Sequence, residues 1–261
     1  MKISIIIPFY KEIDLIGRAT ESVVSNVLDL CDFEIIICND GNFSENEIRS
    51  RLLIDVNCHS KIFQNRYAKG PGGARNTGLD AATGELIAFL DADDYWLPRK
   101  IELQIAAIRS NATFVVTGYC LDVNGGKIMP PQRIKRAEDI FMLRGIGTST
   151  VLVDKRLVED LRFRNIRFGQ DIDFWYALAK QSTFKYVSIE EVLVVYSTSG
   201  STRNKFVQLK YFHQILCLNG LGFGFRARSM FSYIATGVFN HYIKRLFNQV
   251  LKSSSMGEAK R

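Results

Sequence analysis

Short apolar runs alternate with segments of helical periodicity in the first 119 residues of the chain. Apolar runs occupy residues 3–7, 33–38 and 85–90, and the segment 13–27 between the first two has apolar residues three or four positions apart. Runs of this length between turn residues are typical of strands buried on both faces of a sheet. Their alternation with helices predicts an α/β fold with a mainly parallel sheet and helices on both faces.

Capping, turn and periodicity signals predict the other elements. A capping box of Ser44 and Glu47 opens a helix over 45–55, and Pro98 begins a helix that runs to about residue 110. The glycine-rich stretch 70–84 predicts a loop, a helix and a glycine exit. Further strands are expected at 61–64, 113–119, 148–153 and 190–197, a hairpin at 122–127, and a helix that begins near residue 170.

Charge is unevenly distributed along the chain. The net charge is +7, but residues 203–261 carry ten Lys and Arg with one acidic residue, which leaves a net −2 on residues 1–202. A basic segment favours an anionic partner, such as a membrane surface. The five cysteines form no C-x-x-C pair, which argues against a disulfide framework or a zinc site. No apolar stretch approaches the ~18 residues of a membrane span, so we expect a protein that is cytoplasmic or peripheral on the cytoplasmic face of the inner membrane.

Three polar clusters, 8–12, 39–42 and 91–94, come directly after predicted strands. Ligands of parallel sheets bind beyond the carboxyl ends of the strands, so the clusters should converge on one crevice. Asp91 and Asp93 suit a hard divalent cation that takes carboxylate and phosphate oxygens. The alternative is an Asp-rich turn that caps the following helix, because Asp-x-Asp alone is a common sequence.

The chain resembles the bacterial family 2 glycosyltransferases of the GT-A fold over residues 3 to about 202. The resemblance rests on four motifs in the family's order and spacing: SIIIPFYKE at 4–12, EIIICNDGN at 34–42, GPGGARNTGLDAATGELIAFLDADD at 70–94 and GQDIDFWYAL at 169–178. It implies a nucleotide-sugar-binding half at 1–119 and an acceptor-binding half at 120–202. It also implies an inverting enzyme that depends on a nucleotide-sugar.

The resemblance implies a nucleotide-binding role for Pro8, Tyr10, Asp40, Arg75 and Asp91. Pro8 and Tyr10 line the base pocket, and the Tyr10 ring stacks on the base. Asp40 accepts the imide hydrogen of uracil, which favours a UDP-sugar donor, and Arg75 faces the nucleotide. Three of these residues have a structural alternative: a half-buried aromatic at Tyr10, a turn at Asp40, or a surface ion pair of Arg75 with Asp80 or Glu85.

Metal binding and catalysis are likewise implied by the resemblance. Asp93 is the main ligand of Mn²⁺ or Mg²⁺, Asp91 binds the ribose or the metal, and Asp171 is the general base, although it could serve only as a helix cap. The implied reaction moves a hexose to a hydroxyl of a glycan or of a polyprenyl-diphosphate-linked glycan, in synthesis of O-antigen, capsule or a similar polysaccharide. The alternatives are another metal-dependent sugar-nucleotide enzyme and a non-catalytic carbohydrate-binding module of the same fold.

The chain departs from the family's pattern at four places. Lys11 stands where an Asn is usual, Asn39 replaces the first of two acids, and Gln170 replaces a Glu. The sequence YSTSGSTR, which ends at Arg203, lacks the Arg and His that some relatives carry there. Ser201 or Arg203 is therefore the candidate for that phosphate contact, and the identity of the sugar stays open.

Residues 203–261 are expected to form a helical, basic tail. Over 226–252 its apolar residues share one broad helical face from Phe231 to Val250, flanked by Lys and Arg. Such helices often lie in a membrane interface, and packing on the catalytic domain or dimerisation is the alternative. The stretch GLGFGFRARS at 220–229 predicts a linker because of its glycines. No motif indicates nucleic-acid binding.

Overall fold

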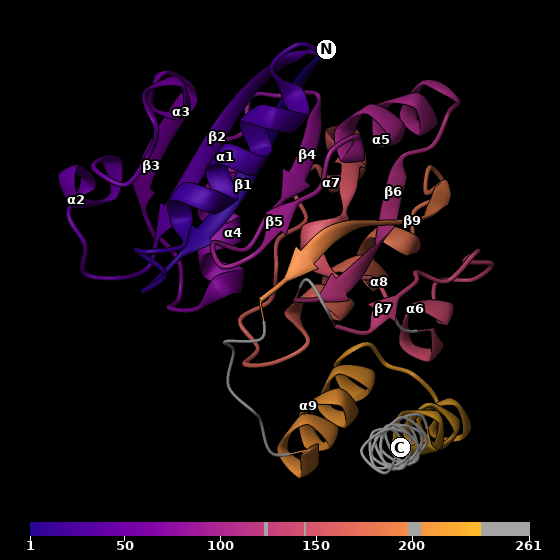
Figure 1. Ribbon diagram of the computed structural model, residues 1–261. Coiled ribbons are helices and arrows are strands. Elements are labelled where there is room, and N and C mark those ends of the chain that lie inside the picture. The colour runs from indigo at the N-terminus through magenta and orange to yellow at the C-terminus, as the bar shows by residue number, and fades with distance from the viewer. Residues whose placement is uncertain (123–124, 144, 198–204, 236–261) are drawn as a thin grey trace, which may run out of the picture. The chain divides into compact units, whose positions relative to one another are not determined.

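The computed structural model shows two compact units, Met1–Thr202 and Arg203–Arg261 (Figure 1). All the catalytic and nucleotide-binding candidates lie in the first unit. The residues that the structure describes are 1–122, 125–143, 145–197 and 205–235. Ser201 and Arg203, the candidates for a phosphate contact, lie outside these residues.

The described part of the first unit is built on a nine-stranded sheet. Its strands are β1 (Lys2–Phe9), β2 (Asp32–Asn39), β3 (Ser60–Gln64), β4 (Leu86–Phe89), β5 (Tyr95–Trp96), β6 (Phe114–Leu121), β7 (Lys127–Ile128), β8 (Leu152–Asp154) and β9 (Tyr186–Tyr196). Hydrogen bonds join them in the order β3-β2-β1-β4-β8-β6-β9-β5, with β7 paired to β6. The sheet therefore places β1 and β4, which precede two of the polar clusters, side by side.

The half of the sheet formed by β3, β2, β1 and β4 is parallel, as the sequence predicted. Ile5 of β1 lies opposite Ile35 of β2 and Ala88 of β4. Ile5 and Ile6 point to opposite faces and are both fully buried. β1, β2 and β4 read as nearly continuous apolar runs because both of their faces are covered, whereas the edge strand β3 is partly exposed.

Beyond β4 the sheet is mixed. β8 is antiparallel to β4 and β6, and β5 is antiparallel to β9, whereas β6 and β9 are parallel. The predicted hairpin is present, with Tyr119 of β6 opposite Ile128 of β7. The parallel order inferred from alternating elements thus holds for the first half of the domain and changes where the alternation stops.

Helices cover both faces of the sheet (Figure 1). They are α1 (Ile16–Val27), α2 (Glu45–Arg49), α3 (Ile54–His59), α4 (Pro71–Ala81), α5 (Lys100–Arg109), α6 (Asp139–Met142), α7 (Lys155–Val158) and α8 (Gln170–Ala179). α1 and α5 pack on the face that includes Ile5. α4 packs on the other face, where a Cβ on Gly78 would come within 2.4 Å of Ile6, so only glycine allows this approach.

The helix expected over 45–55 is two helices, α2 and α3. The Asn57 amide group donates hydrogen bonds to the carbonyls of Arg49 and Leu52, each at 3.3 Å, and thereby satisfies backbone groups at the break. The capping box itself is present, with Ser44 accepting from the backbone of Glu47. The start of the helix was therefore predicted correctly and its length was not.

Two other boundaries were misplaced. α5 begins at Lys100 and not at Pro98, because Arg99 has a φ of 72°, a left-handed conformation that a helix cannot include. The strand expected at 148–153 is a 3₁₀ turn, Thr148–Thr150, followed by the short β8. In that turn the hydroxyl of Thr150 donates to the carbonyl of Gly147 at 2.6 Å, which competes with strand pairing.

The described part of the second unit contains α9 (Lys205–Leu218) and a helix over 223–235. The rings of Phe212 and Tyr233 stack at 4.8 Å, and the Tyr233 hydroxyl donates to Gln208 at 3.3 Å. No helix among the described residues is long and apolar enough to cross a membrane.

The linker predicted at 220–229 is correct only for its first residues. Gly220 has a φ of 67° and follows α9, but the chain is helical again from residue 223. Packing against α9 supports that helix despite Gly224, because tertiary contacts override a weak intrinsic propensity. The predicted apolar face that runs to Val250 lies outside the described residues beyond 235.

Candidate active site

The polar clusters after β1, β2 and β4 meet at the carboxyl end of the parallel strands. The backbone N–H of Asp40 donates to the carbonyl of Phe9 at 2.7 Å, which joins the ends of β2 and β1. Arg18 of α1 donates to the carbonyl of Asp93 at 3.0 Å, so α1 also reaches the loop after β4. The loops after these strands therefore lie near one another at this edge of the sheet, as the positions of the polar clusters predicted.

Arg75 of α4 points at the loop after β4. Its guanidinium donates to the carboxylate of Asp91 at 2.5 Å, and Arg75 is only 5% exposed. Burial alone would lower the pKa of Arg75, but the charge and hydrogen bond of Asp91, together with the charge of Asp171, outweigh it and raise that pKa. The surface ion pair that was the alternative for Arg75 is therefore wrong, and this fixed positive charge lies at the candidate site.

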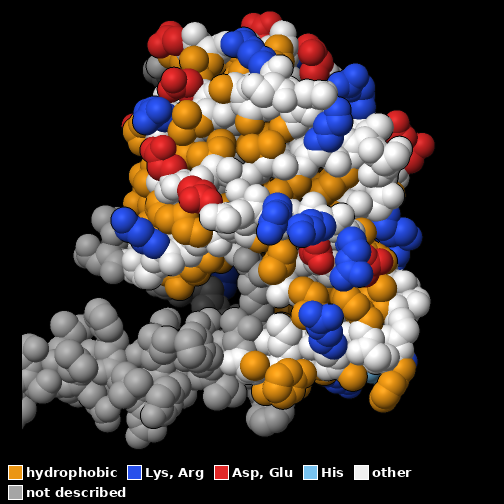
Figure 2. Space-filling view, turned by 90° about the vertical axis from the view of Figure 1, so that its right-hand side faces the viewer, with side chains coloured by type: hydrophobic (Ala, Val, Ile, Leu, Met, Phe, Trp, Pro, Cys, Tyr) orange, Lys and Arg blue, Asp and Glu red, His pale blue; other side chains and the backbone are white. Residues whose placement is uncertain are grey.

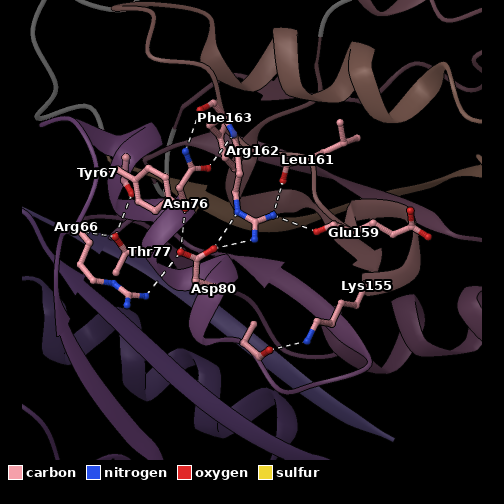
Figure 3. Close-up of polar contacts among 12 residues, drawn as sticks. Arg66, Tyr67, Asn76, Thr77, Asp80, Lys155, Glu159, Leu161, Arg162 and Phe163 are labelled. Atoms are coloured by element: carbon pink, nitrogen blue, oxygen red, sulfur yellow. Dashed lines mark hydrogen bonds and ion pairs between the residues drawn. The ribbon is translucent and has the colours of Figure 1, made fainter.

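Figure 3 shows Asn76, the residue of α4 that follows Arg75, in contact with the chain at Phe163. Asn76 exchanges two hydrogen bonds with the backbone of Phe163, at 2.9 and 2.8 Å. The Phe163 ring in turn lies under the guanidinium of Arg75, 5.6 Å from its carbon, and stacks on Phe174 of α8 at 4.0 Å. Asn76 thus ties α4 to the chain that leads into α8.

The three carboxylates of the loop after β4 have different environments. Asp91 pairs with Arg75, and Asp93 is half-buried. Burial, followed by the charge of Asp91, raises the pKa of Asp93. Asp94 is buried and accepts hydrogen bonds from the hydroxyl of Ser149 at 2.6 Å and from the N–H of Ser197 at 3.1 Å. Asp94 is therefore a structural residue, and Asp91 and Asp93 are the carboxylates of this loop that could contact a ligand.

Ser149, which the sequence did not single out, connects this loop to its surroundings. Its hydroxyl donates to Asp94 and accepts from the N–H of Asp91 at 3.1 Å. Its carbonyl accepts from the indole of Trp96 at 2.9 Å, and its N–H donates to the hydroxyl of Tyr196 at 3.0 Å. Ser149 is fully buried. A serine inside TSTVLV carries no sequence signal for this role.

Asp171 lies in the first turn of α8, as predicted. Burial raises the pKa of its carboxyl, against the opposing charge of Arg75. The helix cap is Gly169, so Asp171 is not the capping residue. Asp173, the other acid of that turn, is buried and pairs with Arg164 at 3.4 Å. Asp171 is thus the acid of α8 that interacts with the Arg75–Asp91 pair.

The base-pocket candidates lie on the loops after β1 and β2. Tyr10 is 48% exposed, which excludes the half-buried alternative, and the ammonium of Lys69 lies 4.9 Å from its ring centre. Pro8 is half-buried at the end of β1. Asp40 accepts hydrogen bonds from the amide of Asn65 at 2.6 Å and from the N–H of Gly70 at 2.8 Å. These bonds fix the Asp40 carboxylate, and a further donor can still reach its remaining lone pairs.

Two of the departures from the family's pattern, Asn39 and Gln170, have structural roles. Asn39 is buried; its side chain accepts from the N–H of Gly41 at 3.0 Å and donates to the carbonyl of Phe43 at 2.7 Å. Gln170 donates to the carbonyl of Ile166, and a Cβ on Gly72 would come within 2.5 Å of its side chain. The starts of α4 and α8 are therefore in close contact.

The residues of the site suit a cation that is shared with a phosphate. Within the described residues no group of three His, Cys, Asp or Glu side chains could hold a metal by itself. Asp91 and Asp93 repel each other, since the charge of Asp91 raises the pKa of Asp93, and a bound cation would relieve this repulsion. Mg²⁺ and Mn²⁺ are commonly held by one or two carboxylates together with substrate phosphates. Asp91 and Asp93 fit that pattern.

Comparison with known proteins gives consistent matches. The family model described as "Glycosyl transferase family 2" matches residues 4–165. The chain is 31% identical to the Escherichia coli UDP-Glc:alpha-D-GlcNAc-diphosphoundecaprenol beta-1,3-glucosyltransferase WfgD, over 92% of this chain and 94% of that protein. It is 27% identical to a Campylobacter jejuni GalNAc(5)-diNAcBac-PP-undecaprenol beta-1,3-glucosyltransferase, over 70% of this chain and 61% of that protein. The structure of S. aureus TarS with UDP-GlcNAc matches with a TM-score of 0.64 at 17% identity, over 90% of this chain and 72% of that one.

Proposed function

The chain belongs to glycosyl transferase family 2, and on that premise we propose that it transfers glucose from UDP-glucose to a lipid-diphosphate-linked glycan. The family, the GT-A fold and the hexosyltransferase activity agree with the sequence predictions. The observation that carries the proposal is the ion pair between the buried Arg75 and the half-buried Asp91, beside Asp93 and Asp171 at the carboxyl end of the parallel strands.

The donor occupies the crevice between the loops after β1, β2 and β4. The exposed ring of Tyr10, beside Pro8, stacks on uracil, and Asp40 accepts the imide hydrogen. Arg75 and the positive end of α4 face the diphosphate. Glucose is supported by the relatives, because two E. coli enzymes at 31% and 30% identity are both named UDP-Glc-dependent beta-1,3-glucosyltransferases.

Asp171 acts as the general base on the acceptor side. It removes the proton of the acceptor hydroxyl while that oxygen attacks the anomeric carbon of glucose. The bond from the anomeric carbon to the diphosphate breaks, UDP departs, and the configuration inverts. Burial raises the pKa of Asp171, which makes its carboxylate a stronger base than an exposed one.

Asp93 and Asp91 would hold Mn²⁺ or Mg²⁺ together with the donor diphosphate, and the cation would supply positive charge that stabilises the leaving group. Arg75 keeps the carboxylate of Asp91 in place before the donor arrives. Ser149 holds the backbone of Asp91 and the side chain of Asp94 on the opposite side of the loop. The loop is thus ordered by protein contacts, which lowers the cost of binding the donor.

The acceptor is a glycan on a polyprenyl diphosphate, in the synthesis of a bacterial surface polysaccharide. WfgD and its Campylobacter counterpart act on diphosphoundecaprenol-linked acceptors by name. Such an acceptor is held in a membrane, so the enzyme works as a peripheral protein at the cytoplasmic face.

The test combines donor binding and transfer. Thermal shifts are measured with UDP, GDP, UDP-glucose, UDP-galactose and UDP-GlcNAc, each with and without Mn²⁺. Transfer is measured to a soluble acceptor, a GlcNAc diphosphate on a short alkyl chain, in an assay without a membrane. We expect Mn²⁺-dependent stabilisation by UDP and a single β-linked glucosyl product. Absence of transfer from any UDP-sugar, or preference for GDP, would contradict the proposal.

A further inference from the structure

The helix over 223–235 exposes its apolar side. Phe223 is 79% exposed, Phe231 74% and Ile234 47%. At about 100° per residue these three positions fall within about 80° of one another around the helix, with the exposed Ala227 between them. Ser229, on the other side, is fully buried. Large apolar side chains therefore lie on the exposed side of the helix, whereas Phe225 and Tyr233 are half-buried.

The inner side of this helix already has its contacts within the second unit. Tyr233 stacks on Phe212 of α9, and Arg226 donates to the Sγ of Cys217 at 2.8 Å. These contacts fix which side of the helix faces outward. We name the outer side, which carries Phe223, Phe231 and Ile234, the Phe223–Phe231 face. The packing of the two helices keeps this face exposed.

The charge around this face is positive. Arg228 is exposed on the same helix, about 60° around the helix from Phe231. Residues 203–261 carry a net +9, whereas residues 1–202 carry a net −2. Figure 2 shows one face of the molecule, on which Lys and Arg are interspersed with Asp and Glu. Exposed aromatic rings beside cations match the boundary between lipid headgroups and acyl chains of an anionic membrane.

We propose that the Phe223–Phe231 face docks the enzyme on anionic lipid, with Phe223, Phe231 and Ile234 inserted among the headgroups. The partner rests on the proposed function, because a lipid-linked acceptor must be reached at a membrane. Insertion of one Phe ring should strengthen partitioning by about tenfold, and loss of both rings should weaken it by about a hundredfold. The attraction between the Lys and Arg side chains and the anionic lipids should weaken as the salt concentration rises, whereas the contribution of the inserted apolar side chains should not.

The test uses the full chain and the double variant Phe223→Ser/Phe231→Ser. Partitioning is measured by flotation with vesicles of phosphatidylglycerol and phosphatidylcholine, and with phosphatidylcholine alone, at low and high salt. The matched control is Leu28→Ser/Leu30→Ser, which removes two exposed apolar side chains from the first unit. We expect the Phe variant to lose about a hundredfold and the Leu variant to bind as the wild type does.

Transfer to the soluble acceptor separates this inference from the proposed function. We expect the Phe variant to keep that activity and to lose transfer to an acceptor embedded in vesicles. A full chain that ignores phosphatidylglycerol vesicles at low salt overturns the docking proposal, as does a Phe variant that binds them normally. A wild-type dimer that becomes a monomer in the Phe variant, without any vesicle binding, assigns the face to a second copy of the chain instead.

Discussion

Replacement of Ser149 by alanine should weaken donor binding, although we do not expect Ser149 to contact the substrate. The substitution removes one hydroxyl and leaves two groups without their partner: the N–H of Asp91 and one carboxylate oxygen of Asp94. The backbone bonds of Ser149 to Trp96 and Tyr196 do not depend on the side chain. The variant therefore tests the support of the Asp91–Asp94 loop alone.

The size of the effect follows from burial. Each buried polar group that loses its partner costs about 1–3 kcal/mol of stability. Two groups lose a partner here, but Asp94 keeps its hydrogen bond from the N–H of Ser197, so the free energy of unfolding should fall by roughly 2–5 kcal/mol. For a domain of this size the Tm should fall by about 5–15 °C. Burial and the charge of Asp91 raise the pKa of Asp94 to about 8, and the Ser149 hydroxyl opposes that rise. Its loss should raise the pKa of Asp94 further.

Ser4 supplies a matched control at the opposite ends of the strands. It too is fully buried; its hydroxyl donates to the carboxylate of Glu34 at 2.7 Å and accepts from the N–H of Gly84 at 2.8 Å. Ser4→Ala should lose similar stability and keep the stabilisation by UDP with Mn²⁺. Ser149→Ala should lose at least about tenfold in UDP affinity, measured by calorimetry below both Tm values. Equal UDP affinities in the two variants would refute the positioning role of Ser149.

Three further variants test other groups. Asp93→Ala should melt normally but show no Mn²⁺-enhanced stabilisation by UDP, and an unchanged enhancement would remove Asp93 from the metal site. Asp171→Asn should lose at least ~10²-fold in kcat with little change in UDP affinity. Because burial raises the pKa of Asp171, wild-type activity should fall on the acid side at a higher pH than for an exposed carboxyl, and a pH–rate profile checks this. Burial opposes the ionisation of Glu34, but its hydrogen bonds, of which that from Lys61 is the strongest, outweigh burial and lower its pKa. The ionised Glu34 therefore stabilises the fold above the pKa of an unfolded glutamate, and this stabilisation is lost as the pH falls through the pKa of Glu34 in the folded protein. Glu34→Gln should lower the Tm near neutral pH and by less in acid, and equal losses at both would contradict this.

The parallel half of the fold was readable because its signals are local. Ile3–Ile7 and the run 33–38 are buried on both faces, so each is a continuous apolar run with polar residues at its end. The position of Asp171 in the first turn of a helix was also predicted, from an acid beside a periodic segment. Local patterns of this kind do not depend on contacts with distant parts of the chain.

The contacts that organise the site depend on residues far apart in the sequence. Ser149 and Asp94 are 55 positions apart, and Asn76 and Phe163 are 87 apart. A hydroxyl or amide that bonds at such a distance has no periodicity or spacing to reveal it. The break between α2 and α3 was missed for a similar reason, because Asn57 satisfies the carbonyls from eight and five residues away.

The ion pair between Arg75 and Asp91 affects how the enzyme would compete for metal in a cell. With one carboxylate already neutralised, and no group of three ligands among the described residues, Asp91 and Asp93 should by themselves have low affinity for free Mn²⁺ or Mg²⁺. In the proposed function the donor diphosphate would supply the missing oxygens, so cation and UDP should each strengthen the binding of the other by the same factor. The fraction of enzyme with bound metal would then rise with the concentration of the donor, and the enzyme would remain nearly metal-free when UDP-sugar is scarce.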